Sequence, residues 1–287
     1  MDNLRGALLM TLAMLGFAIE DAFIKLMAGS WPSGQIILGL GLFGTPIFMA
    51  LARVSGQPLF TPALRHPAVW WRNGAEMVGT FGFVTALTLI PLSLASAILQ
   101  ATPIVVTLGA ALFLGEAVGW RRWTAILVGL MGVMIILRPG FDGFDPNALY
   151  AVLGMAGLAA RDIAVRRIPP TVSTLQLACL GFAALIPTGL ALLVLGGQSF
   201  GPLAGPPLFF FAAALGIGVV AYYLIVQATR VGDVGFVTPF RYTRLIFALL
   251  LGVAFFSERP DVLTLVGAGI VVASGLYTLW REGRLRG

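Results

Sequence analysis

The chain has 287 residues, of which 59% are hydrophobic and only 10% are charged. A soluble domain needs roughly 25% charged residues to cover its surface, so this composition excludes one and favours an integral membrane protein. The net charge of +6 could suit a nucleic-acid-binding protein, but the 18 basic residues are scattered along short loops. We therefore interpret them as signals of membrane topology and expect no nucleic-acid partner.

Ten apolar runs, each bounded by charged residues, proline or glycine, predict ten membrane-spanning helices. The first run is too long for the core of a signal peptide, and we expect it to remain in the mature protein. Connections as short as Ile90-Pro91-Leu92 require neighbouring helices to be antiparallel. In chain order the predicted spans cover residues 4–27, 35–52, 70–90, 93–113, 120–137, 148–165, 173–195, 208–228, 234–256 and 260–280.

The basic residues predict the orientation of these spans. With the N-terminus in the cytoplasm, 12 of the 18 fall in inside segments, two fall outside, and four lie within spans. Membrane proteins carry their basic residues mainly on cytoplasmic loops, so both termini are expected in the cytoplasm. The single cysteine, Cys179, falls within a span, which rules out a disulfide inside the chain.

The chain repeats itself at an offset of 141 or 142 residues. Matching residues recur along its length at this offset: Gly16 and Gly157, Asp21 and Asp162, Gln35 and Gln176, Pro46 and Pro187, Gly74 and Gly216, Ala86 and Ala228, and Glu116 and Glu258. Each repeat holds five helices, so the second begins on the opposite side of the membrane. We predict two inverted repeats, 4–140 and 147–283. Folds of this kind belong to secondary transporters and bind their substrate near the middle of the membrane, between the halves.

Each repeat also carries a glutamate between its fourth and fifth helices. The two stretches read SLASAILQATPIVVTLGAALFLGE over 93–116 and GFVTPFRYTRLIFALLLGVAFFSE over 235–258, and Gly132 and Gly275 follow in the final helices. Over essentially the whole chain this pattern resembles the drug/metabolite transporter superfamily and its EamA-type branch. Within that superfamily the sequence as a whole is similar to YddG-like exporters of aromatic and other amino acids. The second repeat departs by having Pro239 where the first has Ala97, and by two added arginines.

This resemblance implies a ten-helix bundle with a central cavity. Helices 1, 3, 4, 6, 8 and 9 would line the cavity, and helices 5 and 10 would support it from outside. The substrate would be an amino acid, aromatic or neutral, or a related small metabolite. It would cross a bacterial-type inner membrane by alternating access.

Charged residues inside spans are candidate functional residues, because a charge is costly in a bilayer. They comprise four acids, Glu20, Asp21, Glu76 and Asp162, and four bases, Lys25, Arg161, Arg241 and Arg244. The simpler interpretation of Lys25, Arg161 and Asp162 is that they reach the membrane surface from the ends of their spans. Glu20 and Asp21 have a simple alternative in pairing with Lys25, and for Glu76 a place at the membrane surface stays open.

The ninth span holds the clearest candidate site. Arg241 and Arg244 lie three residues apart on one face of it, with Tyr242 between them. A guanidinium group binds a carboxylate through two parallel hydrogen bonds, as recognition of a zwitterionic substrate would require. The alternative is structural pairing of these arginines with Glu76 or Asp162. We expect all three helix-9 residues to face helices 1, 3 and 8.

Polar and aromatic residues on neighbouring spans complete the predicted substrate site. They are Phe17, Asp21, Glu76, Phe83, Ser96, Gln100, Tyr222, Tyr223 and Gln227, with Arg241, Tyr242 and Arg244. Prolines inside spans are predicted to kink helices for gating, namely Pro46, Pro103, Pro187 and Pro239. Tryptophans near span ends are predicted to anchor at the membrane surface, namely Trp31, Trp70, Trp71, Trp120, Trp123 and Trp280. Glu116 and Glu258 are expected to cap helices or form salt bridges.

Other functions have weaker support in the sequence. It has no GxxxxGK[ST] motif for ATP, no Cys/His cluster for a metal, and a single histidine, His66, in a loop. We therefore expect no enzyme, no cofactor and no obligate protein partner, with membrane lipid and a small-molecule substrate as the only ligands. Efflux of cationic drugs and a passive channel stay open as alternatives. Proton antiport and facilitated diffusion are equally compatible with the sequence.

Overall fold

The computed structural model describes residues 2–115, 119–141, 143–231 and 234–286, and these residues form helices joined by short connections. The first half contains α1 (Asp2–Met27), α2 (Ser33–Val54), a short 3-10 helix η1 (Pro62–Arg65), α3 (Pro67–Leu89), α4 (Leu92–Leu99), α5 (Thr102–Phe113) and α6 (Trp120–Leu137). The second half contains α7 (Ala148–Val165), α8 (Thr174–Leu195), α9 (Pro206–Val231), α10 (Val234–Val237), the 3-10 helix η2 (Thr238–Tyr242), α11 (Thr243–Phe256) and α12 (Val262–Arg286).

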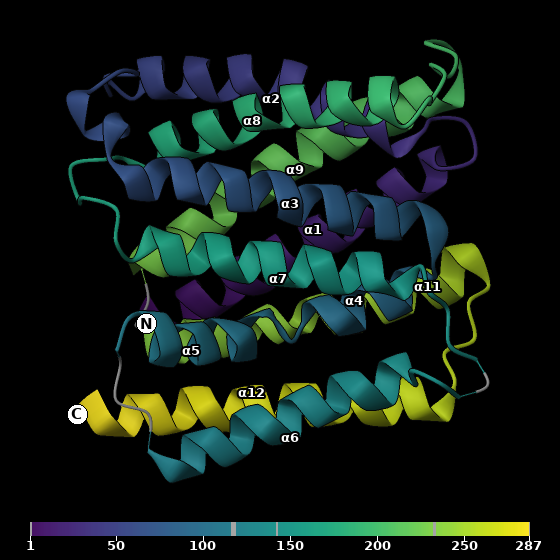
Figure 1. Ribbon diagram of the computed structural model, residues 1–287. Helices are drawn as coiled ribbons and strands as arrows, with labels where there is room; N and C mark the ends of the chain where they lie inside the picture. Colours follow the sequence, from purple (N-terminus) through teal and green to yellow (C-terminus); the bar gives the residue numbers. More distant parts are fainter. Residues whose placement is uncertain (1, 116–118, 142, 232–233, 287) are drawn as a thin grey trace.

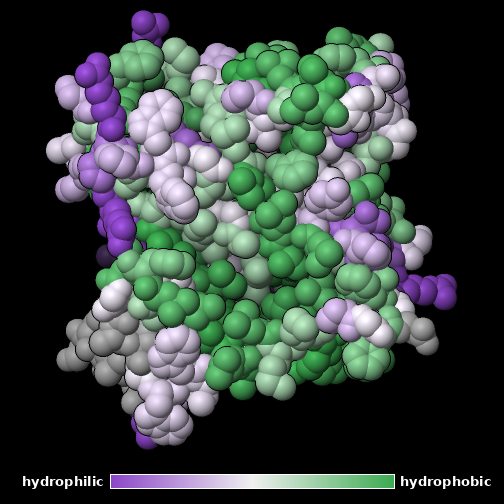
Figure 2. Space-filling view, viewed as in Figure 1, coloured by the Kyte–Doolittle hydropathy of each residue, from purple (hydrophilic) through white to green (hydrophobic). Residues whose placement is uncertain are grey.

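The protein is an all-α membrane protein. Among the described residues, nine helical segments are long and apolar enough to cross a membrane, with α4–α5 and η2–α11 each forming one of them. The one predicted span outside these nine, 70–90, corresponds to α3, which has 23 residues but is less apolar because it carries Arg72, Asn73 and Glu76. Figure 2 shows hydrophobic side chains across the middle of the molecule, and hydrophilic ones mainly toward the left and right margins where the helices end.

The helices pack as pairs that each join the first half of the chain to the second. The closest pairs are α1 with α9, α2 with α8, α3 with α7, and α6 with α12. In Figure 1 the pair α2–α8 lies at one side of the bundle and α6–α12 at the other, with the remaining helices between them. The placement of α6 and α12 agrees with the outer position expected for helices 5 and 10. Both ends of the chain lie at the same end of the bundle (Figure 1).

Glycines allow two of these pairs to approach closely at corresponding positions. A Cβ atom on Gly157 of α7 would collide with the backbone of Gly79 on α3. A Cβ atom on Gly16 of α1 would lie 2.8 Å from the Cβ of Ala221 on α9. The repeat offsets place Gly16 on Gly157 and Gly79 on Ala221. The α1–α9 and α7–α3 contacts therefore use repeat-related positions, which supports the predicted inverted repeat.

Two spans are broken, and both breaks fall at corresponding places in the repeats. The fourth span is interrupted at Gln100 and Ala101, between α4 and α5. Pro103 has no N–H to offer the Leu99 carbonyl, which instead accepts a hydrogen bond from Thr102 Oγ1 at 2.5 Å. The ninth span changes from α10 to the 3-10 helix η2 and then to α11. Each broken segment still forms a single span, as the sequence predicts, and Pro103 and Pro239, two of the prolines predicted to kink helices, lie at the breaks.

Candidate functional site

A buried ion pair joins the first and ninth spans. Arg244 of α11 donates hydrogen bonds to Oδ2 of Asp21 on α1, from Nη2 at 2.6 Å and from Nε at 3.1 Å. The Asp21 side chain is 4% exposed and that of Arg244 is 18% exposed. Asp21 therefore pairs with Arg244, and the simple pairing considered for it, with Lys25, is wrong. The pairing of Arg244 with Glu76 or Asp162 is also wrong.

Two aromatic rings flank the guanidinium group of this pair. Its central carbon lies 5.4 Å from the ring centroid of Phe17 on α1 and 5.5 Å from that of Phe83 on α3. A cation near a ring face is attracted by the electrons of the ring, and the attraction is stronger where water is excluded. Four predicted site residues, Phe17, Asp21, Phe83 and Arg244, thus meet although they come from three helices.

The two breaks in the spans lie against each other beside this cluster. Gln100, at the end of α4, donates from Nε2 to the carbonyl of Arg241 in η2 at 3.3 Å. The Ser96 hydroxyl, one turn earlier on α4, is buried and has no hydrogen-bond partner among the described residues. Breaks of this kind expose backbone groups at the level where transporters of inverted-repeat architecture bind their cargo.

The three helix-9 residues do not share one direction. Arg241 is partly buried and lies within electrostatic range of Asp162 and Arg161 on α7, and of Arg244. Tyr242 instead packs toward α12, where its hydroxyl occupies the space that a side chain on Gly275 would need. The expectation that Tyr242 faces helices 1, 3 and 8 is wrong for its hydroxyl, which lies against Gly275 of α12.

A second ion-pair network ties α3 to α7. Glu76 accepts from Arg72 at 2.7 Å and from Arg161 at 3.2 Å. Arg161 also pairs with Asp162 at 2.9 Å, and Arg72 donates to the Leu177 carbonyl of α8 at 2.9 Å. Arg161 and Asp162 are thus engaged in the ion-pair network between α3 and α7, with side chains 27% and 28% exposed.

Arg72 is a member of this network that sequence reasoning missed. The charge distribution places it among the 12 basic residues expected at the cytoplasmic side, whereas its side chain is only 10% exposed. The available signal was its spacing from Glu76, since residues four apart on a helix are neighbours. α3 begins at Pro67, three residues before the predicted span, so Arg72 lies in its second turn.

The repeat glutamate Glu258 caps a helix. Its carboxylate accepts hydrogen bonds from the backbone N–H groups of Leu92 and Ser93, at 2.6 and 2.9 Å, and from the Ser93 hydroxyl at 2.6 Å. Lys25 lies 3.9 Å from the same carboxylate and donates to the Ile90 carbonyl at 2.5 Å. Capping by Glu258 is therefore confirmed, and it stabilises the first turn of α4. Its repeat counterpart, Glu116, lies outside the described residues.

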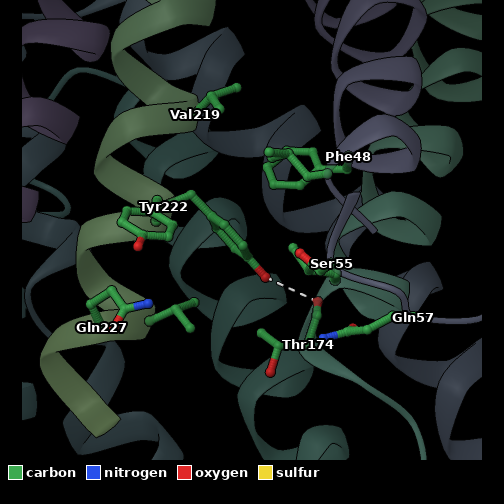
Figure 3. A pocket seen from close by; sticks show the side chains of 11 residues that line it. Phe48, Ser55, Gln57, Thr174, Val219, Tyr222 and Gln227 are labelled. Carbon is green, nitrogen blue, oxygen red and sulfur yellow. Dashed lines mark hydrogen bonds between the residues drawn. The ribbon is translucent and has the colours of Figure 1, made fainter. Parts of the chain in front are cut away.

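Three predicted site residues line a separate cavity between α2, α8 and α9. It has a volume of about 130 Å³, and Tyr222, Tyr223 and Gln227 form the α9 side (Figure 3). Tyr222 donates a hydrogen bond to the Thr174 carbonyl at 3.2 Å, and its ring meets Phe48 edge-on with centroids 5.0 Å apart. Tyr223 is 59% exposed. The predicted single site is thus divided into at least two parts.

The predicted kinks and anchors also differ from one another in the structure. Pro103 and Pro239 lie at the broken spans, whereas α2 and α8 continue as α-helices through Pro46 and Pro187. Most of the tryptophans are exposed or partly exposed near helix ends. Trp31 is an exception and corrects the prediction, because it is 3% exposed and donates to the Pro202 carbonyl at 2.7 Å. Among the described residues no group of three His, Cys, Asp or Glu could hold a metal.

The chain matches a known family along almost its whole length. Residues 4–138 and 146–280 each match the model of the EamA-like transporter family. A known crystal structure shares the fold with a TM-score of 0.60 at 21% identity, covering 98% of this chain and 99% of that one. The family match confirms the predicted resemblance to the drug/metabolite transporter superfamily.

Curated relatives of the chain are bacterial transporters of several small molecules. The riboflavin transporter of Rhizobium johnstonii is 28% identical over 97% of this chain and 92% of its own length. The S-adenosylmethionine uptake transporter of Rickettsia prowazekii is 25% identical, with 97% and 94% covered. The pseudopaline exporter CntI of Pseudomonas aeruginosa is 27% identical, with 94% of each chain covered. These names indicate transport of small molecules and do not single out the YddG-like branch.

Proposed function

Because the chain belongs to the EamA-like transporter family, we propose that it moves small zwitterionic metabolites, foremost aromatic or neutral amino acids, across the bacterial inner membrane. It is a multi-pass membrane protein, and its relatives are transporters of small molecules. Transport proceeds by alternating access, and export is the direction that we propose. The substrate binds beside the Asp21–Arg244 pair.

The observation that carries this proposal is the partly buried guanidinium of Arg244, which lies between two aromatic rings at the broken spans. The carboxylate of an amino acid binds Arg244 in place of, or in addition to, Asp21, because a guanidinium can form several hydrogen bonds at once. Phe17 and Phe83 offer apolar surface to the side chain of the substrate. A zwitterion brings a positive charge for each negative charge, so its entry leaves the net charge of the site unchanged.

The helix packing supports alternating access. Each of the pairs α1–α9, α2–α8 and α3–α7 joins one repeat to the other, so the repeats can rock against each other along these contacts. Gln100 and Arg241 connect the two broken spans, so a rocking motion of the repeats would change the distance between these residues. Their single hydrogen bond of 3.3 Å is long enough to be exchanged easily for contacts with a substrate.

Transport into proteoliposomes tests the proposal. The panel contains labelled aromatic, aliphatic and charged amino acids, riboflavin, S-adenosylmethionine, a nucleotide sugar and a lipophilic cation. Saturable transport of aromatic or neutral amino acids, lost in Arg244→Ala, is the expected result. Transport of the lipophilic cation alone would instead favour drug efflux, and ion conductance without saturable transport would favour a channel. Vesicles loaded with labelled substrate, in which efflux from the cytoplasmic side of the protein is measured, test whether transport runs in the direction of export.

A further inference from the structure

Glu20 lies next to the ion pair but is not part of it. It precedes Asp21 on α1, and Arg244 donates its hydrogen bonds to Asp21. Among the described residues no hydrogen bond or salt bridge reaches the Glu20 carboxylate, and the charges that act on it are those of Asp21 and Arg244. Two acids therefore share one base at this position, and the three groups carry a formal charge of −1 when all are ionised.

The Glu20 carboxylate faces a glycine on α9. A Cβ atom added to Gly218 would lie 2.6 Å from Oε1 of Glu20 and 2.7 Å from its carboxyl carbon, closer than two such atoms can approach. A Cβ atom added to the nearby Gly216 would have open space around it. Gly218 thus leaves room for the carboxylate, and even a methyl group there would displace it.

The contact between α3 and α7 contains the repeat counterparts of Glu20 and Gly218. The repeat offsets place Glu20 on Arg161 and Glu76 on Gly218. Between α7 and α3, Arg161 meets Glu76 at 3.2 Å as an ion pair. Between α1 and α9 the same two positions hold an acid and a glycine. Between α7 and α3, the charge of the glutamate is balanced by the arginine. Between α1 and α9, no basic residue stands at the corresponding position.

A partly buried carboxylate without a cation is costly in a membrane, and a ligand that supplies the cation removes this cost. Phe17 lies three residues before Glu20 and therefore on a neighbouring part of the same helix face. A zwitterion with its carboxylate at Arg244 and its side chain at Phe17 brings its ammonium group toward Glu20.

Building on the proposed function, we infer that Glu20 binds the ammonium group of the transported metabolite, and that Gly218 makes this possible. Glu20 thereby selects substrates that carry a positive group in addition to a carboxylate. Asp21 keeps its place beside Arg244 and positions the guanidinium. Selection of the ammonium group thus depends on a residue other than the one that binds the carboxylate.

The test compares analogues that differ by one charged group. Transport of labelled phenylalanine is competed by unlabelled phenylalanine, by 3-phenylpropionate, which lacks the ammonium group, and by phenethylamine, which lacks the carboxylate. In the unchanged protein, 3-phenylpropionate should be weaker than phenylalanine by roughly tenfold to a hundredfold, as expected for one hydrogen bond between charged groups. In Glu20→Gln the two should compete almost equally, and phenethylamine should lose its effect.

Gly218→Ala should act like Glu20→Gln, because the new methyl group displaces the carboxylate. Gly216→Ala is the matched control and should leave the preference unchanged. Stabilisation of the detergent-solubilised protein by each analogue, measured as the shift in unfolding temperature, gives the same comparison for a variant that binds without transporting.

Each result supports or overturns the inference. An unchanged preference in Glu20→Gln, with transport retained, overturns the role of Glu20 and leaves the proposed function standing. Loss of pH-gradient-driven transport in Glu20→Gln, with the preference intact, assigns a proton to this residue and also overturns the inference. Absence of saturable amino-acid transport in the unchanged protein overturns the proposed function, and the inference with it.

Discussion

Replacing both members of the Asp21–Arg244 pair separates a structural role from a role in transport. The variants are Asp21→Asn, Arg244→Gln and the two combined. Each single change leaves one charge in a nearly dry place, since the two side chains are 4% and 18% exposed. The double variant leaves two neutral amides, which can hydrogen-bond to each other.

The expected loss of stability follows from this burial. Removing one partner of a buried pair costs about 3–5 kcal/mol, whereas replacing both by neutral groups is often close to neutral. A chain of this size loses about 2 °C of unfolding temperature per kcal/mol. Each single variant should therefore unfold roughly 6–10 °C lower. The Arg244→Gln variant should fall slightly further, because it also loses the contacts with Phe17 and Phe83.

Thermal unfolding in detergent and transport in proteoliposomes are measured on the same four proteins. The double variant should recover most of the unfolding temperature and still fail to transport amino acids, because no guanidinium remains for the carboxylate. A double variant that transports normally would refute the role of Arg244 in substrate binding. A double variant as unstable as the single ones would refute the argument from charge burial.

Three further predictions concern stability. Glu258→Ala should lower the free energy of unfolding by about 3 kcal/mol, because it leaves the first N–H groups of α4 without acceptors, and it should not change the preference among substrates in competition assays. Gly157→Ala should cost about 1–3 kcal/mol in thermal unfolding through collision with the α3 backbone, whereas Gly269→Ala has open space and should cost little. A hydrogen bond donated by Arg138 lowers the pKa of Asp261, which directly precedes α12, from 3.8 to about 2. The stability that this half-exposed pair contributes should be complete above about pH 4 and lost as the pH falls toward 2. The change in the free energy of unfolding should be below about 1 kcal/mol. Unfolding measured over a series of pH values should show this change in the unaltered protein and not in Asp261→Asn.

The helices themselves were predictable because the membrane imposes their length and composition. Eight of the ten predicted spans correspond to one helix each, and the other two, 93–113 and 234–256, correspond to broken helical segments, with outer ends that differ by a few residues at most places. The sequence predicted kinks at Pro103 and Pro239, but not that the helix would end at Gln100 or become a 3-10 helix in η2. A proline inside an apolar run is equally compatible with a kink, a break or a continuous helix, as the continuous α2 with Pro46 shows. Which of these occurs depends on the neighbouring helices that satisfy the freed backbone groups.

The charge partners were not predictable from spacing. Asp21 and Arg244 are 223 residues apart in the chain, and their contact depends on the rotation of two helices about their axes. Spacing along one helix suggested Lys25 as the partner of Asp21, but Lys25 is engaged at Glu258. Burial of Trp31 has a similar cause, since the connection containing Pro202 folds over it. In each case tertiary contacts between distant segments decide the outcome.

The differences between the two repeats indicate where selectivity lies. Positions that are alike in both halves, such as the close contacts of Gly16 and Gly157, serve packing and motion, which both halves need equally. Positions that differ give the site its polarity. The repeat offset places Arg244 on Thr102, so only one of the two broken spans carries a guanidinium. A symmetric pair of breaks would bind a substrate equally well in two opposite orientations. Under the proposed function, we expect one guanidinium in a single repeat to hold the carboxylate of the substrate at one end of the site.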